Sequence, residues 1–75
     1  MLFPDKLFTY RESVLSKFPV VLDVIKTQPI KVKDLYVAVN KDVSGTAEFM
    51  DVLDCLYALG KINYDTQEEV LRYVE

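Results

Sequence analysis

A chain of 75 residues with one cysteine and no histidine has to be stabilised almost entirely by its apolar residues. Domains of this size bury only about 60% of the surface that their unfolded chains expose, so many depend on disulfides or a structural metal. Cys55 has no second cysteine to pair with, and one thiol without a histidine does not supply the four ligands of a zinc site. The hydrophobic share of 51% therefore predicts a single domain with a dense core and some apolar surface facing another chain.

The first nine residues have the composition of an apolar arm that packs on something. Pro4 is expected to prevent an early helix there. We therefore predict that residues 1–9 contact the domain or a partner, and that residues 10–75 form the domain itself. Large apolar side chains in the arm are Leu2, Phe3, Leu7 and Phe8.

The same N-terminal segment does not resemble a targeting signal. It lacks the basic region and the uninterrupted apolar stretch of a signal peptide. No apolar run in the chain approaches the ~18 residues that a membrane span requires. We expect a cytoplasmic protein that does not contact a membrane.

The first helical pattern covers residues 16–27, where apolar residues recur at steps of three and four. Pro19 is compatible with this helix only near its start, and Ser16 is the candidate N-cap. A kinked extension back to Tyr10 is an alternative start. Gln28 and Pro29 end the pattern.

Two further helices are predicted in the middle of the chain. The segment 33–40 is a short helix without a good N-cap residue. The next helix is the clearest element, with Ser44 or Thr46 as its cap and one continuous apolar stripe. Gly60 lies where a left-handed C-terminal cap belongs.

The remaining segments predict strands. Residues 30–32 form a candidate short strand, and residues 62–64 and 70–74 form a candidate hairpin rich in β-branched and aromatic residues. A helix over 66–75 is the alternative, because residues 66–69 match a capping box. We favour the hairpin, since residues 61–64 would otherwise lack a strand partner. The predicted fold is mainly α (α+β) and winged-helix-like, with three helices, a short strand and a C-terminal β-hairpin.

The residues that catalysis needs are missing from the sequence. There is no histidine to act as a base, and Cys55 follows Asp54, unlike the electropositive surroundings that activate thiols. We expect Cys55 to be a semi-buried structural thiol. Glu48, Asp51 and Asp54 share one helix face but do not converge on one point, so no metal site is predicted. We expect neither a catalytic site nor a cofactor, and therefore no enzyme.

The same three carboxylates argue against DNA recognition by the third helix, because phosphates would repel them. We therefore expect no sequence-specific nucleic-acid binding, and predict a protein-interaction module whose aromatic residues anchor a partner. The candidate interface combines apolar, acidic and tyrosine side chains: Leu2, Phe3, Phe8, Glu48, Asp51, Asp54, Tyr57, Tyr64 and Tyr73.

The segment 48–62, EFMDVLDCLYALGKI, resembles the "F…ALDLLYALGKI" segment of small middle components of ABC-three-component systems, the Lamassu-like bacterial defence group. The segments 2–6 and 30–36 are similar to that family as well, so the likeness covers nearly the whole chain. It implies a non-catalytic adaptor in anti-phage or anti-plasmid defence. The implied partners are a large ATPase related to SMC and Rad50 proteins and an effector subunit, often a nuclease.

Two hypotheses for the function follow. The first is the adaptor subunit that the resemblance implies, which in isolation could form a homodimer. The second is a stand-alone winged-helix DNA-binding transcriptional regulator, also dimeric. The acidic third helix argues against the regulator, whereas the apolar arm is compatible with either hypothesis.

Overall fold

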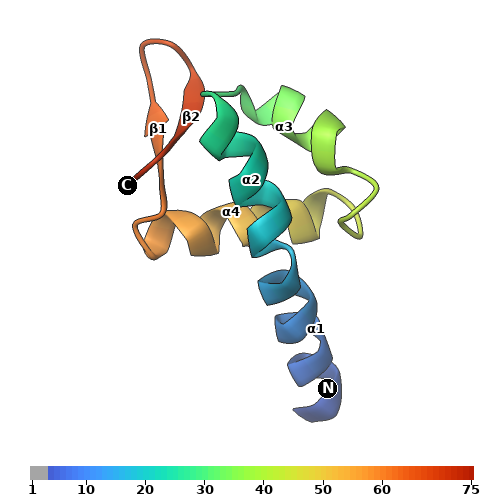
Figure 1. Cartoon of the computed structure of the whole chain (residues 1–75). Coiled ribbons are helices and arrows are strands. Elements are labelled where there is room, and N and C mark those ends of the chain that lie inside the picture. The colour runs from blue at the N-terminus through green and yellow to red at the C-terminus, as the bar shows by residue number, and fades with distance from the viewer. Residues whose placement is uncertain (1–3) are drawn as a thin grey trace.

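The computed structural model describes the backbone of residues 4–75 and the side chains of residues 9–75. Three helices enclose the core, a hairpin packs against two of them, and a further helix projects from this body (Figure 1). The domain is α+β, and the three predicted helices and the hairpin are confirmed. The elements in chain order are α1 (Pro4–Ser16), α2 (Phe18–Thr27), α3 (Val32–Val39), α4 (Thr46–Ala58), β1 (Ile62–Asp65) and β2 (Val70–Tyr73).

The first segment of the chain is a helix, and the expectation that Pro4 prevents one is wrong. Pro4 is the first residue of α1, a position where the missing N–H would have no acceptor within the helix anyway. What the sequence suggested as a kinked extension of the main helix is thus a separate helix. Leu2 and Phe3 lie outside the described residues, and for Phe8 only the backbone is described.

The junction between α1 and α2 consists of one residue, Lys17. Pro19 is the second residue of α2, near the helix start as predicted. The predicted N-cap role of Ser16 is wrong: its hydroxyl donates to the Ser13 carbonyl at 2.7 Å, and Lys17 takes the N-cap position. The short loop keeps α1 and α2 close to one line, with the N-terminus at the far end of α1 (Figure 1).

The core lies between α2, α3, α4 and the hairpin. Each of these elements contributes side chains that are withdrawn almost completely from water, worth about 1.5–3 kcal/mol apiece. Tyr36 of α3 packs edge-to-face on Phe49 of α4, with ring centroids 5.0 Å apart. The side chains with the least exposure are Val21, Ile25, Leu35, Val39, Val52, Leu56 and Ile62.

The hairpin pairs β1 with β2 in antiparallel register, Ile62 opposite Tyr73 and Tyr64 opposite Leu71. The alternative helix over residues 66–75 is therefore wrong. Ile30 exchanges two backbone hydrogen bonds with Leu71, at 3.1 and 2.8 Å. This bridge is all that remains of the predicted strand at 30–32, because α3 already begins at Val32.

The hairpin turn is closed by Asp65. The carboxylate accepts hydrogen bonds from the backbone N–H groups of Gln67 and Glu68, at 2.9 and 3.1 Å, and from Arg72 Nε at 3.0 Å. The Glu68 N–H, followed by Arg72, lowers the pKa of Asp65. Glu69 supplies the left-handed residue of the turn, with φ +57°.

Gly60 ends α4 as predicted. Its N–H donates to the Tyr57 carbonyl at 3.0 Å and the Lys61 N–H donates to the Leu56 carbonyl at 2.9 Å, the two bonds of a Schellman cap. Its φ is +75°, a conformation that costs other residues energy even though a Cβ would meet no atom within 4 Å.

We expect Gly60→Ala to lower the free energy of unfolding by about 1–2 kcal/mol through this conformational penalty alone. Urea denaturation would measure the loss. Gly60→Asn is the matched control and should lose less, because asparagine tolerates the left-handed region. Equal stability of the alanine variant and the wild type would contradict this account of the cap.

Candidate interaction surfaces

Glu48 is an internal residue, and its predicted place on an exposed acidic face is wrong. The side chain is 4% exposed. Gly45 is the N-cap of α4, so Glu48 is the third helical residue, and it reaches back to accept the Ser44 N–H at 3.1 Å. The bond resembles the acidic half of a capping box, although its donor is the residue before the N-cap. The predicted capping role of Ser44 or Thr46 is wrong, because no side-chain hydroxyl caps α4.

Two residues from the start of the chain complete the surroundings of Glu48. The Ser13 hydroxyl donates to its carboxylate at 2.7 Å, and Lys17 Nζ lies 3.5 Å from it. The Ser13 hydrogen bond, then the Ser44 N–H and Lys17, lower the pKa of Glu48, against the opposing effect of burial. Glu48 therefore holds α1 and the α1–α2 junction to the start of α4.

Asp51, one turn further along α4, also faces α1. The Tyr10 hydroxyl donates a hydrogen bond to its carboxylate. This bond, with smaller contributions from burial and from the neighbouring acids, raises the pKa of Tyr10 to about 12. Asp54 is exposed. The three acids of the predicted face are thus separated: one is buried, one is hydrogen-bonded to α1, and one is exposed to solvent.

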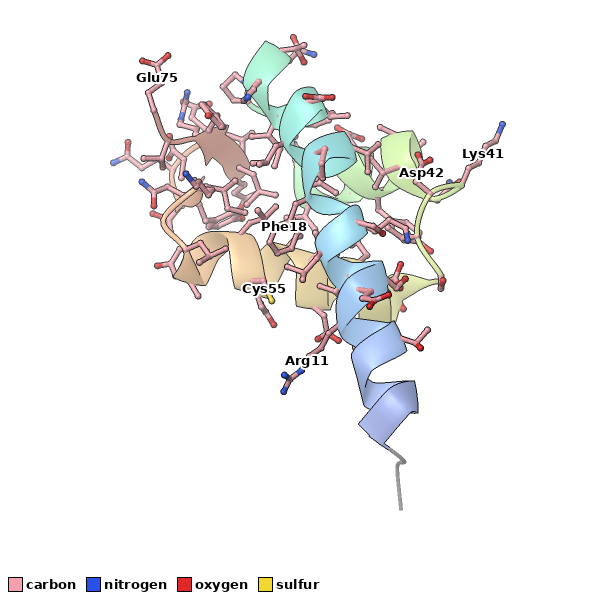
Figure 2. The ribbon with its side chains drawn as sticks, turned by 60° about the horizontal axis from the view of Figure 1, so that its bottom comes forward. Arg11, Phe18, Lys41, Asp42, Cys55 and Glu75 are labelled. Atoms are coloured by element: carbon pink, nitrogen blue, oxygen red, sulfur yellow. The ribbon has the colours of Figure 1, made fainter. Side chains whose placement is uncertain are left out.

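An open, mostly apolar groove of about 480 Å³ runs between α1 and α4, and we call it the α1–α4 groove. Figure 2 shows the side chains of Arg11 and Cys55 in the angle between these helices. Cys55 is exposed there, so the expectation of a semi-buried thiol is wrong. The groove is lined by Tyr10, Arg11, Val14, Leu15, Asp51, Asp54 and Cys55.

The three candidate tyrosines differ in exposure. Tyr57 on α4 is 61% exposed and Tyr64 on β1 is 46% exposed. Tyr73 is half-buried against the core, and Lys26 Nζ lies 5.0 Å from its ring centroid, a cation–π contact. Tyr57 and Tyr64 are therefore available to a partner, whereas Tyr73 mainly stabilises the end of α2 against the hairpin.

Sequence reasoning missed two exposed apolar residues of the groove, Tyr10 and Leu15, which are 42% and 58% exposed. Both belong to α1, the helix that Pro4 seemed to exclude. The four-residue step from Tyr10 to Val14 is helical, and it supports the alternative helix start at Tyr10.

The side chains described, residues 9–75, bring no three cysteine or acidic residues together in a way that could hold a metal ion. No helix within the described part of the chain has the length and apolar character to span a membrane.

Comparison with known proteins identifies the family of this chain. Neither the curated proteins nor the solved structures contain a significant match. The family model of ABC-three component (ABC-3C) system Middle Component 7, by contrast, matches residues 3–71, which span α1 to β2. As a middle component, such a protein belongs to a system with further components. The chain is a member of the Middle Component 7 family of ABC-3C systems.

Proposed function

We propose that this middle component is a non-catalytic adaptor in a cytoplasmic, Lamassu-like bacterial complex that defends against phages or plasmids. Its partners in this proposal are an SMC/Rad50-like ATPase and an effector subunit such as a nuclease. The observation that carries the proposal is the family match over residues 3–71. The order α2, Ile30 bridge, α3, α4 and hairpin is compatible with a winged helix preceded by α1.

The partner surface in this proposal is formed by Asp54, Tyr57 and Tyr64, which we call the tyrosine surface. Tyr57 lies one helical turn after Asp54 on α4, and Tyr64 lies on β1, which packs against α4. Buried aromatic side chains supply much of the energy of protein interfaces. The exposed carboxylate of Asp54 favours a basic partner surface and faster encounter with it.

A regulator that reads DNA through α4 is less compatible with these residues. The exposed residues of α4 include Asp51, Asp54 and Tyr57, and α4 has no basic side chain. Phosphates would be repelled by the two carboxylates. The family match also favours a component of a multi-subunit system over a stand-alone protein.

We expect the double substitution of Tyr57 and Tyr64 by alanine to weaken capture of the other system components at least about tenfold, the loss that corresponds to 1.4 kcal/mol. Both tyrosines are substantially exposed, so the fold should persist. The measurement is co-purification of the tagged chain with the products of the neighbouring genes, followed by titration of the captured component.

The matched control is Val37→Ala on α3, which removes a 65% exposed apolar side chain elsewhere. It should capture partners as the wild type does. Undiminished capture by the tyrosine variant would place the contact on another surface. Failure of the wild-type chain to capture any component would contradict the adaptor function.

A further inference from the structure

The N-terminal half of α1 extends beyond the body of the domain (Figure 1). The molecule measures 42 Å along its longest axis but only 24 and 19 Å along the others. Among the described side chains of α1, Val14 alone is buried. Helices of this length are marginal in water without tertiary packing. The projecting half of α1 therefore suits packing against a neighbouring molecule.

We propose that a second copy of this chain packs its α1 antiparallel into the α1–α4 groove, forming a two-fold symmetric dimer. The inference goes beyond the adaptor function and does not depend on it. In such a contact the same surface is used twice, so the groove of each copy receives the α1 of the other.

The apolar residues of the groove support this occupant. Leu15 and Tyr10 line the groove and remain 58% and 42% exposed, so both offer apolar surface to a second helix. Antiparallel pairing that sets Leu15 of one helix opposite Tyr10 of the other also sets Arg11 opposite Val14, so the two Arg11 side chains do not lie opposite each other. The two exposed apolar residues of the groove then cover each other.

The α1–α4 groove carries opposite charges on its two walls, so a second copy related by two-fold symmetry can pair with both. Arg11 stands on the α1 wall, whereas Asp51 and Asp54 stand on the α4 wall. Asp51 already accepts a hydrogen bond from Tyr10, and Asp54 is exposed. A helix lying between the two walls brings Arg11 of each copy toward Asp54 of the other. Two equivalent ion pairs then flank the axis, and each favours the antiparallel arrangement.

The first test is the molar mass of the isolated full-length chain by sedimentation equilibrium, from micromolar to several hundred micromolar. The wild type should move from one 8.7 kDa chain to a dimer. Leu15→Asp should keep it monomeric. The control Val37→Asp places the same charge on an exposed position of α3 and should dimerise as the wild type does. A wild type that stays monomeric throughout overturns the proposal.

The second test exchanges the charges. Arg11→Glu and Asp54→Arg should each raise the dimer dissociation constant at least about tenfold, since each creates two like-charge contacts by symmetry. The combination of both substitutions restores opposite charges and should recover most of the wild-type affinity. Dimers that tolerate the single reversals, or that the combined variant does not restore, overturn this arrangement.

Cys55 provides an independent readout, because it is exposed and lines the groove. A second α1 in the groove would cover it, so its alkylation by excess maleimide should slow as protein concentration rises. The Arg11→Glu variant should show no such slowing over the same range. A wild-type rate that is independent of concentration while the dimer forms shows that the dimer uses another face. These measurements involve no other component, so their failure is distinguishable from failure of the adaptor function.

Discussion

Replacing Leu56 with alanine should lower the free energy of unfolding by about 2–5 kcal/mol. Leu56 is fully buried, at the point where α4 meets the rest of the core. Removing three of its carbons loses their burial and leaves a cavity that the surrounding elements fill only partly. For a chain of 75 residues this approaches the whole stability of about 4–11 kcal/mol. Urea denaturation followed by circular dichroism would measure the loss.

Leu59→Ala is the control for this experiment. Leu59 lies three residues further along the chain and is 61% exposed, so the same chemical change should alter the free energy of unfolding by no more than about 0.5 kcal/mol. Similar losses in the two variants would mean that α4 presents a different face to the core.

Replacing Glu48 with alanine should cost about 3 kcal/mol, more than most substitutions of acidic residues in small domains. The change removes one acceptor from the Ser13 hydroxyl, the Ser44 N–H and Lys17 Nζ. Lys17 is itself largely buried, with a side chain that is 19% exposed, so its charge is left without compensation. Thermal or urea denaturation of the variant would show the loss, together with weaker attachment of α1.

The pH dependence of stability provides a second measurement on Glu48. Its pKa is lower in the folded protein than the ordinary value of 4.5. A carboxylate of this kind contributes its full stabilisation above the ordinary pKa and loses it as the pH falls through the folded value. Glu48→Gln should therefore flatten the decline of stability below about pH 4.5. If the wild type and Glu48→Gln lost the same stability as the pH falls, this would contradict the stabilising role of the ionised Glu48 carboxylate.

The elements that sequence reasoning predicted well are those whose signals are local. The apolar stripe of α4 and its glycine cap lie within one segment, and Gly60 adopts the left-handed conformation that the pattern required. The hairpin was favoured over a helix because residues 61–64 needed a strand partner, and β2 is that partner. Each of these decisions depended on residues a few positions apart.

The environment of the acidic residues was not predictable in the same way. The spacing of Glu48 to Asp51 and Asp54 suggested that its side chain points outward. Its hydrogen-bond donor Ser13, however, lies 35 positions earlier in the chain, so a local pattern could not indicate this contact. Asp51 likewise meets Tyr10, 41 positions away. Both contacts exist because α1 forms and packs against α4, whereas the sequence analysis kept a helical start at Tyr10 only as an alternative. The spacing of the acids along α4 could not show that Glu48 and Asp51 meet residues of α1.

Because only Lys17 separates α1 from α2, a rotation at this junction would displace the N-terminal end of α1 much more than its C-terminal end. A helix of 13 residues is about 20 Å long. Rotating it by about 20° about Lys17 would move the first turn by roughly 7 Å, while Ser13, one turn from the pivot, would move by about 2 Å. Adjustments of this size are small enough for the Glu48 side chain to follow by changing rotamer. The N-terminal end of α1 would then move over a wide arc while the hydrogen bond between Ser13 and Glu48 stays intact.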